Sequence, residues 1–167
     1  MLSYQHAYHA GNLADLHKHA LLAWMLDYLT AKPKPLSYVE THAGRGLYDL
    51  AAPESEKTGE AQAGITRALS EDWLPSDHPL RQALEAIRAQ HGVTAYPGSP
   101  LIASLMLRGD DRIALCEVQD AETAALKKLF AGDRRVGVHQ RDGYAALPGL
   151  VPPKERRGLV LIDPPFE

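Results

Sequence analysis

Several features are scarce in this chain, and each scarcity excludes a class of protein. Its 167 residues include one cysteine, Cys116, so no internal disulfide can form, and we expect a small buried hydrophobic residue in a reducing cytoplasm. No run of about 18 apolar residues is present, so we expect no membrane span. The N-terminus also lacks the basic and apolar regions of a secretory signal, which favours a cytoplasmic protein.

Phosphate-binding loops and an excess of positive charge are also missing. No G-x-x-x-x-G-K-[ST] segment occurs, which disfavours a nucleoside triphosphate as ligand. The formal net charge is -3, so binding to nucleic acid would require local basic patches. Each candidate patch is by itself more typical of a solvated surface than of a phosphate contact. The candidates are Lys32/Lys34, Lys127/Lys128, Arg134/Arg135 and Lys154/Arg156/Arg157.

The apolar segments that are present alternate between strand and helix patterns. This alternation predicts an α/β fold with a mostly parallel sheet and helices on both faces. The length and the hydrophobic content of 45% indicate a single domain over residues 1–167 with a sizeable core. The four expected strands lie at about 36–41, 112–117, 135–139 and 158–163.

The expected helices follow from apolar spacing and capping residues. The first runs from a cap at Asn12 or Asp15 to about Leu29, with Trp24 on its apolar face. Residues from about 50 to 96 interrupt the alternation and contain helices of their own, which predicts a helical insertion. Tyr96 to Pro100 is expected to be a rigid turn in which Ser99 caps the next helix. The later expected helices are 59–69, 79–91, 100–107, 121–130 and 144–147.

Polar residues follow every expected strand. Carboxyl ends of parallel strands meet at one edge of a sheet, where open α/β sheets bind ligands. These residues are His42 and Gly44 after the first strand, Glu117 at the second, Asp142 and Gly143 beyond the third, and Asp163 at the fourth. The convergence predicts a binding site at this edge.

The residue types at this edge suggest a cofactor of particular shape. A carboxylate such as Glu117 can accept hydrogens from both hydroxyls of a ribose. Asp142 is placed to accept from an adenine amine, and Gly44 allows the main chain to meet a short charged tail. The cofactor indicated is therefore an adenosine that carries such a tail.

The segment Asp163-Pro164-Pro165-Phe166 suggests the reaction. An exocyclic amine on a nucleobase is a poor nucleophile because its lone pair is delocalised into the ring. A carboxylate and a backbone carbonyl held side by side can accept both amine hydrogens, while the Phe166 ring stacks on the base. The segment matches the [DNS]-P-P-[YFW] motif of amino-methyltransferases that use S-adenosylmethionine. The plainer alternative is a strand that ends in a Pro-Pro turn.

Several stretches together resemble one family. They are Ser3-Tyr4 through Lys18-His19, Thr41–Gly44, Thr58–Glu60, Tyr96–Ala103 and Arg157–Pro165. They look like the signature of the J-type adenine-N6 methyltransferases of 23S ribosomal RNA, whose members were formerly labelled as proteins for catabolism of external DNA. The resemblance implies a Rossmann-like class I fold and methyl transfer from S-adenosylmethionine to an adenine N6 amine.

The resemblance also implies roles for particular residues. Asp163 would hold the target amine and accept its proton, in a corner shared with Pro164 and Phe166, where the family more often has Tyr. Tyr4, Lys18 and Phe166 would lie close to the RNA substrate, which the helical insertion would help to grip. No metal, membrane or obligate protein partner is implied. The cofactor would be lined by His19, His42, Gly44, Ser99, Glu117, Asp142 and Gly143.

The family is also longer than this sequence. A complete class I sheet has seven strands, whereas this sequence stops at Glu167, just after the fourth. We therefore expect a truncated sheet in which the strand at 158–163 is an open apolar edge.

Two alternatives remain open at this point. A metal-dependent nuclease or hydrolase acting on DNA could use His6-x-x-His9 and His17-x-His19, with Asp15 or Asp163 as carboxylate ligands. A non-catalytic RNA- or cofactor-binding fragment is the other alternative.

Overall fold

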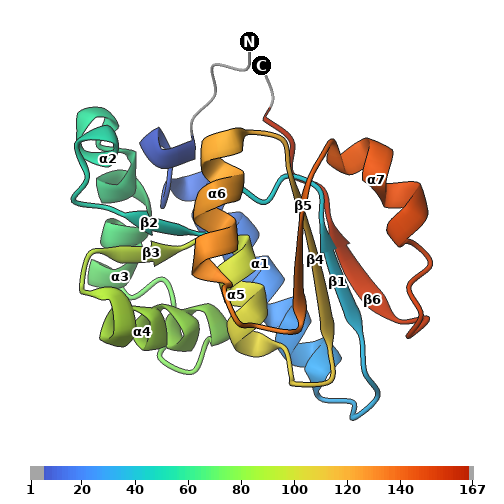
Figure 1. The fold of residues 1–167 in the computed structure, drawn as a ribbon. Helices are drawn as coiled ribbons and strands as arrows, with labels where there is room; N and C mark the ends of the chain where they lie inside the picture. Colours follow the sequence, from blue (N-terminus) through green and yellow to red (C-terminus); the bar gives the residue numbers. More distant parts are fainter. Residues whose placement is uncertain (1–5, 166–167) are drawn as a thin grey trace.

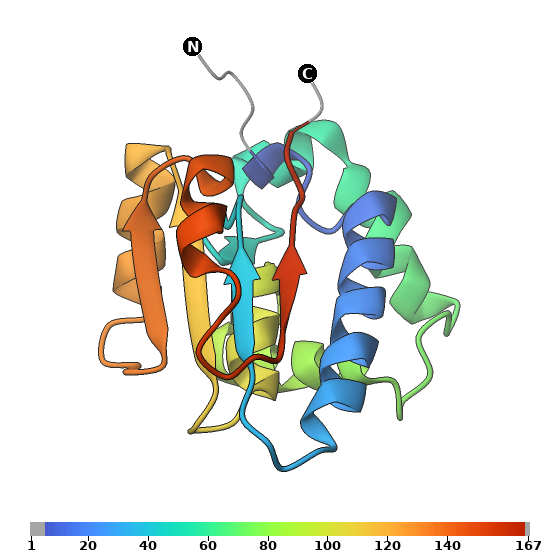
Figure 2. The ribbon, with the colours of Figure 1, turned by 90° about the vertical axis from the view of Figure 1, so that its right-hand side faces the viewer.

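The computed structural model describes residues 6–165, and its central feature is a four-stranded parallel sheet. The strand order is β5-β4-β1-β6, and every neighbouring pair is parallel. The arrowheads therefore lie at one end of the sheet (Figure 2). The strands are β1 (Ser37–Glu40), β4 (Arg112–Glu117), β5 (Val136–Gln140) and β6 (Gly158–Leu161). All four predicted strands are confirmed to within two residues.

Helices cover both faces of this sheet. Figure 1 shows α1 (Leu13–Thr30), α5 (Ser99–Met106) and α6 (Asp120–Leu129) on one side and α7 (Gly143–Leu150) on the other. β1 runs through the centre, and all four of its residues are buried. This arrangement confirms the predicted α/β class.

Helix α1 begins as the sequence predicts, and most of its expected apolar face is buried. The side chain of Asn12 accepts a hydrogen bond from the backbone N–H of Asp15 and caps the helix. Leu16, Ala23 and Leu26 are buried in the core. The prediction for Trp24 is wrong, because this residue lies about 100° around the helix from Ala23 and is 60% exposed.

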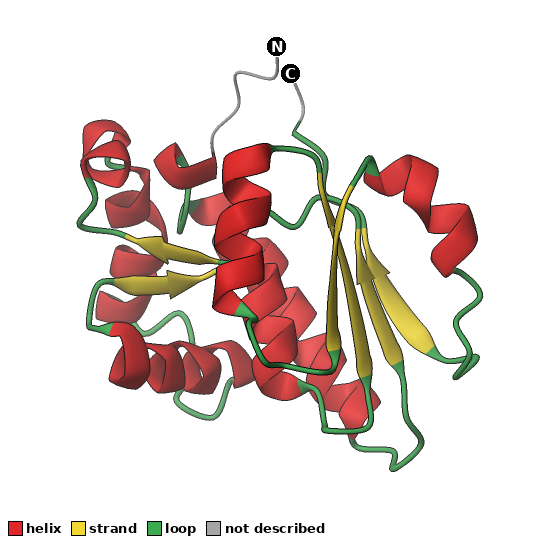
Figure 3. Ribbon diagram, viewed as in Figure 1, coloured by secondary structure: helices red, strands yellow, loops and turns green. Residues whose placement is uncertain are grey.

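The segment between β1 and α5 holds short helices and a second, two-stranded ladder. Figure 3 shows these pieces gathered on the side of the molecule away from α7. β2 (Leu47–Asp49) pairs antiparallel with β3 (Ala95–Pro97), so part of the predicted turn at 96–100 is a strand. The helices are α2 (Pro53–Thr58), the π-helical η2 (Gln62–Thr66), α3 (Arg67–Ser70) and α4 (Pro79–His91). The predicted helix at 79–91 is confirmed.

The helix predicted over 59–69 is present over residues 60–70, where it comprises η2 and α3, but it is kinked at a glycine. Gly59 adopts a left-handed conformation with φ of 67° and ends α2. Gly64 has non-helical angles, φ -93° and ψ -108°, and a Cβ there would lie 2.1 Å from the carbonyl oxygen of Gly11. The backbone of the N-terminal segment therefore packs where a side chain would stand.

Other departures occur at the ends of elements. The first described residues form a short 3-10 helix, η1 (His6–Tyr8), where a loop was expected. Gly98, not Ser99, is the cap of α5. Helix α7 is longer than predicted and includes Pro148.

β6 lies at an edge of the sheet, as expected, with Val160 37% and Ile162 46% exposed. No helix within residues 6–165 is long and apolar enough to cross a membrane.

The two ends of α7 differ in the space around their glycines, which gives a matched stability test. A Cβ at Gly143 would lie 2.1 Å from the Thr41 carbonyl oxygen, whereas one at Gly149 would meet nothing within 4 Å. We expect Gly143→Ala to lower the free energy of unfolding by about 1–3 kcal/mol. Gly149→Ala should leave it unchanged or raise it by up to about 1 kcal/mol. Urea denaturation measures both, and equal effects would contradict this packing.

Candidate active site

A pocket of about 520 Å³ lies at the carboxyl ends of the strands. Its volume falls in the range of about 300–1,000 Å³ that is usual for small-molecule sites. Residues from α1, from the loop after β1 and from the ends of β4 and β6 line it. The predicted site residues among them are Lys18, His19, His42, Gly44, Ser99, Glu117, Asp163 and Pro164. The fold thus brings together residues that are far apart in the sequence, such as Lys18 and Pro164.

The glycine-rich loop after β1 forms one wall of this pocket. Gly44 has φ of +62°, a left-handed conformation that side chains rarely adopt. A Cβ at this position would also lie 2.6 Å from the hydroxyl oxygen of Tyr48. Only glycine therefore fits at this position without a shift of Tyr48.

Glu117 ties this loop to the end of β4. Its carboxylate accepts backbone N–H bonds from Gly44 at 2.8 Å, Val118 at 2.8 Å and Gln119 at 2.9 Å. A carboxylate has roughly four lone-pair positions, so about one remains for a ligand. The sequence predicts that Glu117 accepts hydrogen bonds from both ribose hydroxyls. The three backbone N–H bonds leave room for only about one of them.

His19 is the pocket residue with an unused polar atom. Its side chain is 1% exposed, and its Nδ1 lies 2.9 Å from the hydroxyl of Tyr96. Burial lowers the pKa of His19 to about 3, so the ring is neutral at neutral pH. Nε2 is buried and has no hydrogen-bond partner among the described residues. Because an unpaired buried polar atom is costly, this atom fits a polar group of a ligand.

Glu40 at the end of β1 was not predicted as a site residue. It is 1% exposed and accepts hydrogen bonds from Ser99 Oγ at 2.5 Å and from Tyr38 Oη at 2.8 Å. Burial raises the pKa of Glu40 to about 8, although these two hydrogen bonds oppose the shift. The carboxyl group fixes Ser99 in the pocket wall. The only sequence signal was an acidic residue directly after the apolar part of a strand.

Asp163 is held by an ion pair with α1. Lys18 Nζ lies 2.6 Å from Asp163 Oδ2 and 2.9 Å from Asp15 Oδ1. Burial would lower the pKa of Lys18, but the two carboxylates outweigh it and hold the pKa above its usual value. The ammonium is therefore permanently charged. The structure thus adds Asp15 to the site, which the sequence had suggested only as a cap or metal ligand.

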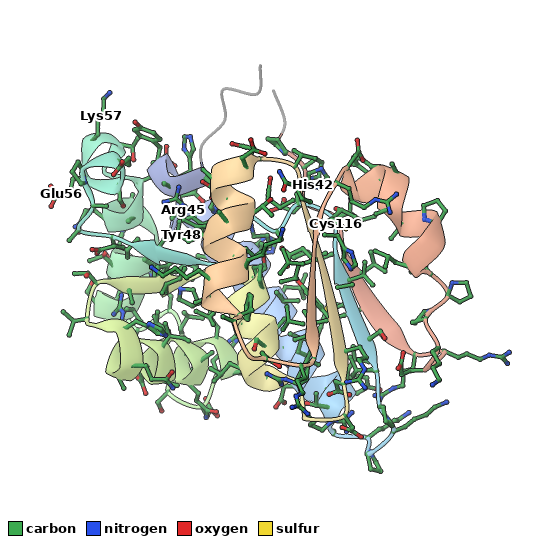
Figure 4. The ribbon with its side chains drawn as sticks, viewed as in Figure 1. His42, Arg45, Tyr48, Glu56, Lys57 and Cys116 are labelled. Atoms are coloured by element: carbon green, nitrogen blue, oxygen red, sulfur yellow. The ribbon has the colours of Figure 1, made fainter. Side chains whose placement is uncertain are left out.

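Asp142 and Gly143 are not among the residues that line this pocket. The Asp142 carboxylate accepts a hydrogen bond from the backbone N–H of Ala145 and caps α7, and a ring contact of 5.2 Å joins Tyr144 to His42. Figure 4 shows His42 beside the carboxyl ends of the strands. The predicted positions Tyr4 and Phe166 lie outside the described residues.

The histidines considered for metal binding make other contacts. His6 Nε2 lies 2.8 Å from Asp15 Oδ2, and His9 Nδ1 lies 2.9 Å from Glu60 Oε1. Over the part of the chain that the structure describes, no three His, Cys, Asp or Glu side chains are grouped as a metal would require. The described residues therefore do not supply the ligand set of the metal-dependent alternative.

A second cavity of about 310 Å³ opens beside the β2–β3 ladder. Arg45, Tyr48 and His91 are among its lining residues, and none of the predicted site residues contributes to it. In the view of Figure 4, Arg45 and Tyr48 lie across α6 from His42. Tyr48 also lines the larger pocket, so its ring is part of the wall of both cavities.

The raised pKa of Glu40 predicts a pH dependence of stability. The native carboxyl binds its proton up to about pH 8, whereas its ordinary pKa is 4.5. Glu40 therefore contributes stability at low pH that is lost as the pH rises between these two values. In Glu40→Gln, we expect the free energy of unfolding to fall less steeply from pH 5 to pH 8, by up to about 1.4 kcal/mol per pH unit. Urea denaturation at several pH values measures this free energy. The same dependence of the unfolding free energy on pH in both proteins would contradict the prediction.

The chain was compared with known families and structures. A family model described as "Ribosomal RNA large subunit methyltransferase D, RlmJ" matches residues 33–167. Proteins named "Ribosomal RNA large subunit methyltransferase J" from Escherichia coli and Haemophilus influenzae are 41% and 43% identical to this chain over 168 and 171 residues. Each match covers 100% of this chain but 60% of the relative.

A solved structure gives the same relationship in three dimensions. A crystal structure of a Legionella pneumophila protein superposes with a TM-score of 0.82 at 42% identity, over 95% of this chain and 59% of that one. The chain thus spans about three fifths of the length of the relatives it matches. It belongs to the J-type family of large-subunit ribosomal RNA methyltransferases, as its sequence motifs had indicated.

Proposed function

We propose that this protein transfers a methyl group from S-adenosylmethionine to the N6 amine of an adenine in 23S ribosomal RNA. The family of the chain supports methylation of large-subunit ribosomal RNA. The observation that carries the finer proposal is the position of Asp163 in the same pocket as His19, Gly44 and Glu117. A carboxylate that can hold an amine thus shares one cavity with groups suited to an adenosine-shaped cofactor.

The residues present fit S-adenosylmethionine, which supplies an electrophilic methyl group when bound. The buried Nε2 of His19 would pair with a polar group of the cofactor. If the Tyr96 hydroxyl donates to Nδ1, then Nε2 carries the hydrogen and donates, as a cofactor carboxylate requires. Glu117 would offer its remaining lone pair to a ribose hydroxyl. His42, Gly44 and Ser99 would complete this wall.

Asp163 and Pro164 would hold the target amine. Lys18 Nζ donates a hydrogen bond to Asp163 Oδ2. Among the described residues, no other group donates to this carboxylate. Oδ1 is thus left to accept one amine hydrogen, and the backbone carbonyl of Pro164 would accept the other. Two such bonds favour a pyramidal nitrogen whose lone pair is localised. The amine then becomes a stronger nucleophile than it is in the free base.

The chemistry of the amine decides when the proton leaves. A neutral aromatic amine is a far weaker acid than a carboxylic acid, so Asp163 would not deprotonate it before the new bond forms. Once nitrogen has gained the methyl group it becomes strongly acidic, and Asp163 can then accept the proton. Asp163 is 40% exposed, which gives the proton a route to water.

Several other assignments remain part of this proposal. Tyr4 would contact the RNA, and the Phe166 ring would stack on the flipped adenine. Asp142 and Gly143, which follow β5, would lie near the cofactor. The helical insertion, from about residue 50 to residue 96, would help to grip the RNA.

Replacement of Asp163 tests the proposed reaction. In the protein expressed from its complete reading frame, we expect Asp163→Ala to lower labelling of protein-free large-subunit ribosomal RNA by tritiated S-adenosylmethionine at least about 100-fold. The reason is that both the amine acceptor and the proton acceptor are lost. Undiminished labelling in a variant that still binds S-adenosylhomocysteine would contradict the role of Asp163.

Cofactor binding can be tested without activity. We expect calorimetric titration with S-adenosylhomocysteine to show binding, and titration with zinc to show none. His19→Phe should weaken the binding by roughly 10- to 100-fold, because it removes the buried Nε2. Tyr96→Phe is the matched control, since it keeps the His19 ring and removes only the hydroxyl beside Nδ1, and it should have a smaller effect. Equal affinity in His19→Phe and the unchanged protein would argue against this site.

A further inference from the structure

The carboxylate of Asp15 is the most enclosed charge beside the pocket. It is 2% exposed and sits in the first turn of α1. Its Oδ2 accepts a hydrogen bond from the backbone N–H of Gly11 at 3.0 Å and lies 2.8 Å from His6 Nε2. Its Oδ1 lies 2.9 Å from Lys18 Nζ. Both oxygens are thus engaged, and the group is fixed from three directions.

Lys18 connects this fixed carboxylate to the proposed catalytic one. Its ammonium lies between Asp15 and Asp163, at 2.9 Å and 2.6 Å. Asp163 is 40% exposed, whereas Asp15 is 2% exposed, so Asp15 is the immobile partner of the two. A lysine has a flexible stem whose many rotamers are costly to restrict. A buried second anion one helical turn away restricts them before any substrate arrives.

We propose that Asp15 is a positioning residue, which fixes the Lys18 ammonium beside Asp163 so that one oxygen of Asp163 stays free for the target amine. This inference rests on the proposed function, because it assigns a purpose to the geometry of the same site. Asp15 itself would touch neither the amine nor the methyl group and would act through Lys18.

The electrostatics of Asp15 agree with this role. Burial would raise the pKa of Asp15, but the neighbouring imidazoles and the Lys18 ammonium hold it well below its usual range. The group is therefore an anion under all ordinary conditions. Removal of that anion would leave Lys18 with Asp163 as its one carboxylate partner, and the ammonium would be free to follow the more exposed side chain.

A second acid in the same region provides a matched control. Glu60 accepts a hydrogen bond from Asn12 Nδ2 at 2.9 Å and lies 2.9 Å from His9 Nδ1. It thus anchors the same N-terminal segment as Asp15, but no contact joins it to Lys18 in the described structure. Glu60→Gln reports on the placement of that segment alone.

The test compares Asp15→Asn with Glu60→Gln in the protein expressed from its complete reading frame. Asparagine keeps an acceptor for the Gly11 N–H and removes the charge that holds Lys18. We expect kcat for methylation of protein-free large-subunit ribosomal RNA to fall roughly 10- to 100-fold in Asp15→Asn. The affinity for S-adenosylhomocysteine and the KM for S-adenosylmethionine should change less than about threefold. Glu60→Gln should change kcat less than about threefold.

A double-mutant cycle with Lys18→Met separates positioning from a general structural effect. If Asp15 acts through Lys18, Asp15→Asn should lower kcat by less than about twofold once Lys18 is Met. If the double variant instead lowers kcat by the product of the two single effects, the inference is wrong. So would an equal loss of kcat in Glu60→Gln, because the N-terminal segment alone would then explain it.

The outcomes also separate this inference from the proposed function. Failure of the unchanged protein to label the RNA would overturn the proposed function itself. Normal labelling by both the unchanged protein and Asp15→Asn would overturn only the role of Asp15. If Asp15→Asn does not fold, as judged by its melting transition, Asp15→Glu takes its place. That variant keeps the charge but displaces it by one methylene, and we expect it to lower kcat without loss of S-adenosylhomocysteine binding.

Discussion

The pairing of β1 with β4 on one side and β6 on the other is the constraint on which the pocket depends. Glu40, the last residue of β1, is in register with Leu115 of β4 and Leu161 of β6. The three strands therefore end at nearly the same level, and the residues that follow them meet. This pairing places the loop at Gly44, the carboxylate of Glu117 and the corner at Asp163 around one cavity.

Three buried or nearly buried carboxylates lie beside this cavity, and each is stabilised differently. Glu117 is satisfied by backbone N–H groups, Asp15 by a cation, an imidazole and one N–H, and Glu40 by two hydroxyls. The consequences differ for Asp15 and Glu40, because the charged neighbours of Asp15 outweigh the effect of burial, whereas the two hydroxyls only partly oppose it at Glu40. Asp15 stays ionised, whereas burial raises the pKa of Glu40 to about 8. Neighbouring acids can thus act as a fixed anion and as a neutral hydrogen-bonding group.

The pocket also links segments that belong to different parts of the fold. Tyr96 of β3 contacts His19 of α1, and Tyr48 of β2 stands beside Gly44. The small antiparallel ladder therefore supports two walls of the pocket, although it lies outside the four-stranded sheet. This gives the segment between β1 and α5 a structural role in the site, in addition to any contact with RNA.

Local sequence patterns were enough to predict the strands, their parallel arrangement and most of the residues that line the pocket. Strand periodicity and polar residues after each strand are local signals, and they correctly predicted that Gly44, Glu117 and Asp163 line one cavity. The kink at Gly64 and the exposure of Trp24 were not predictable, because they depend on the backbone of the N-terminal segment and on the packing of α1 against α5. The sharing of charges depends on the tertiary structure. The contacts of Lys18 with Asp163 and of Glu40 with Ser99 join residues 145 and 59 positions apart, and sequence spacing carries no information about such contacts.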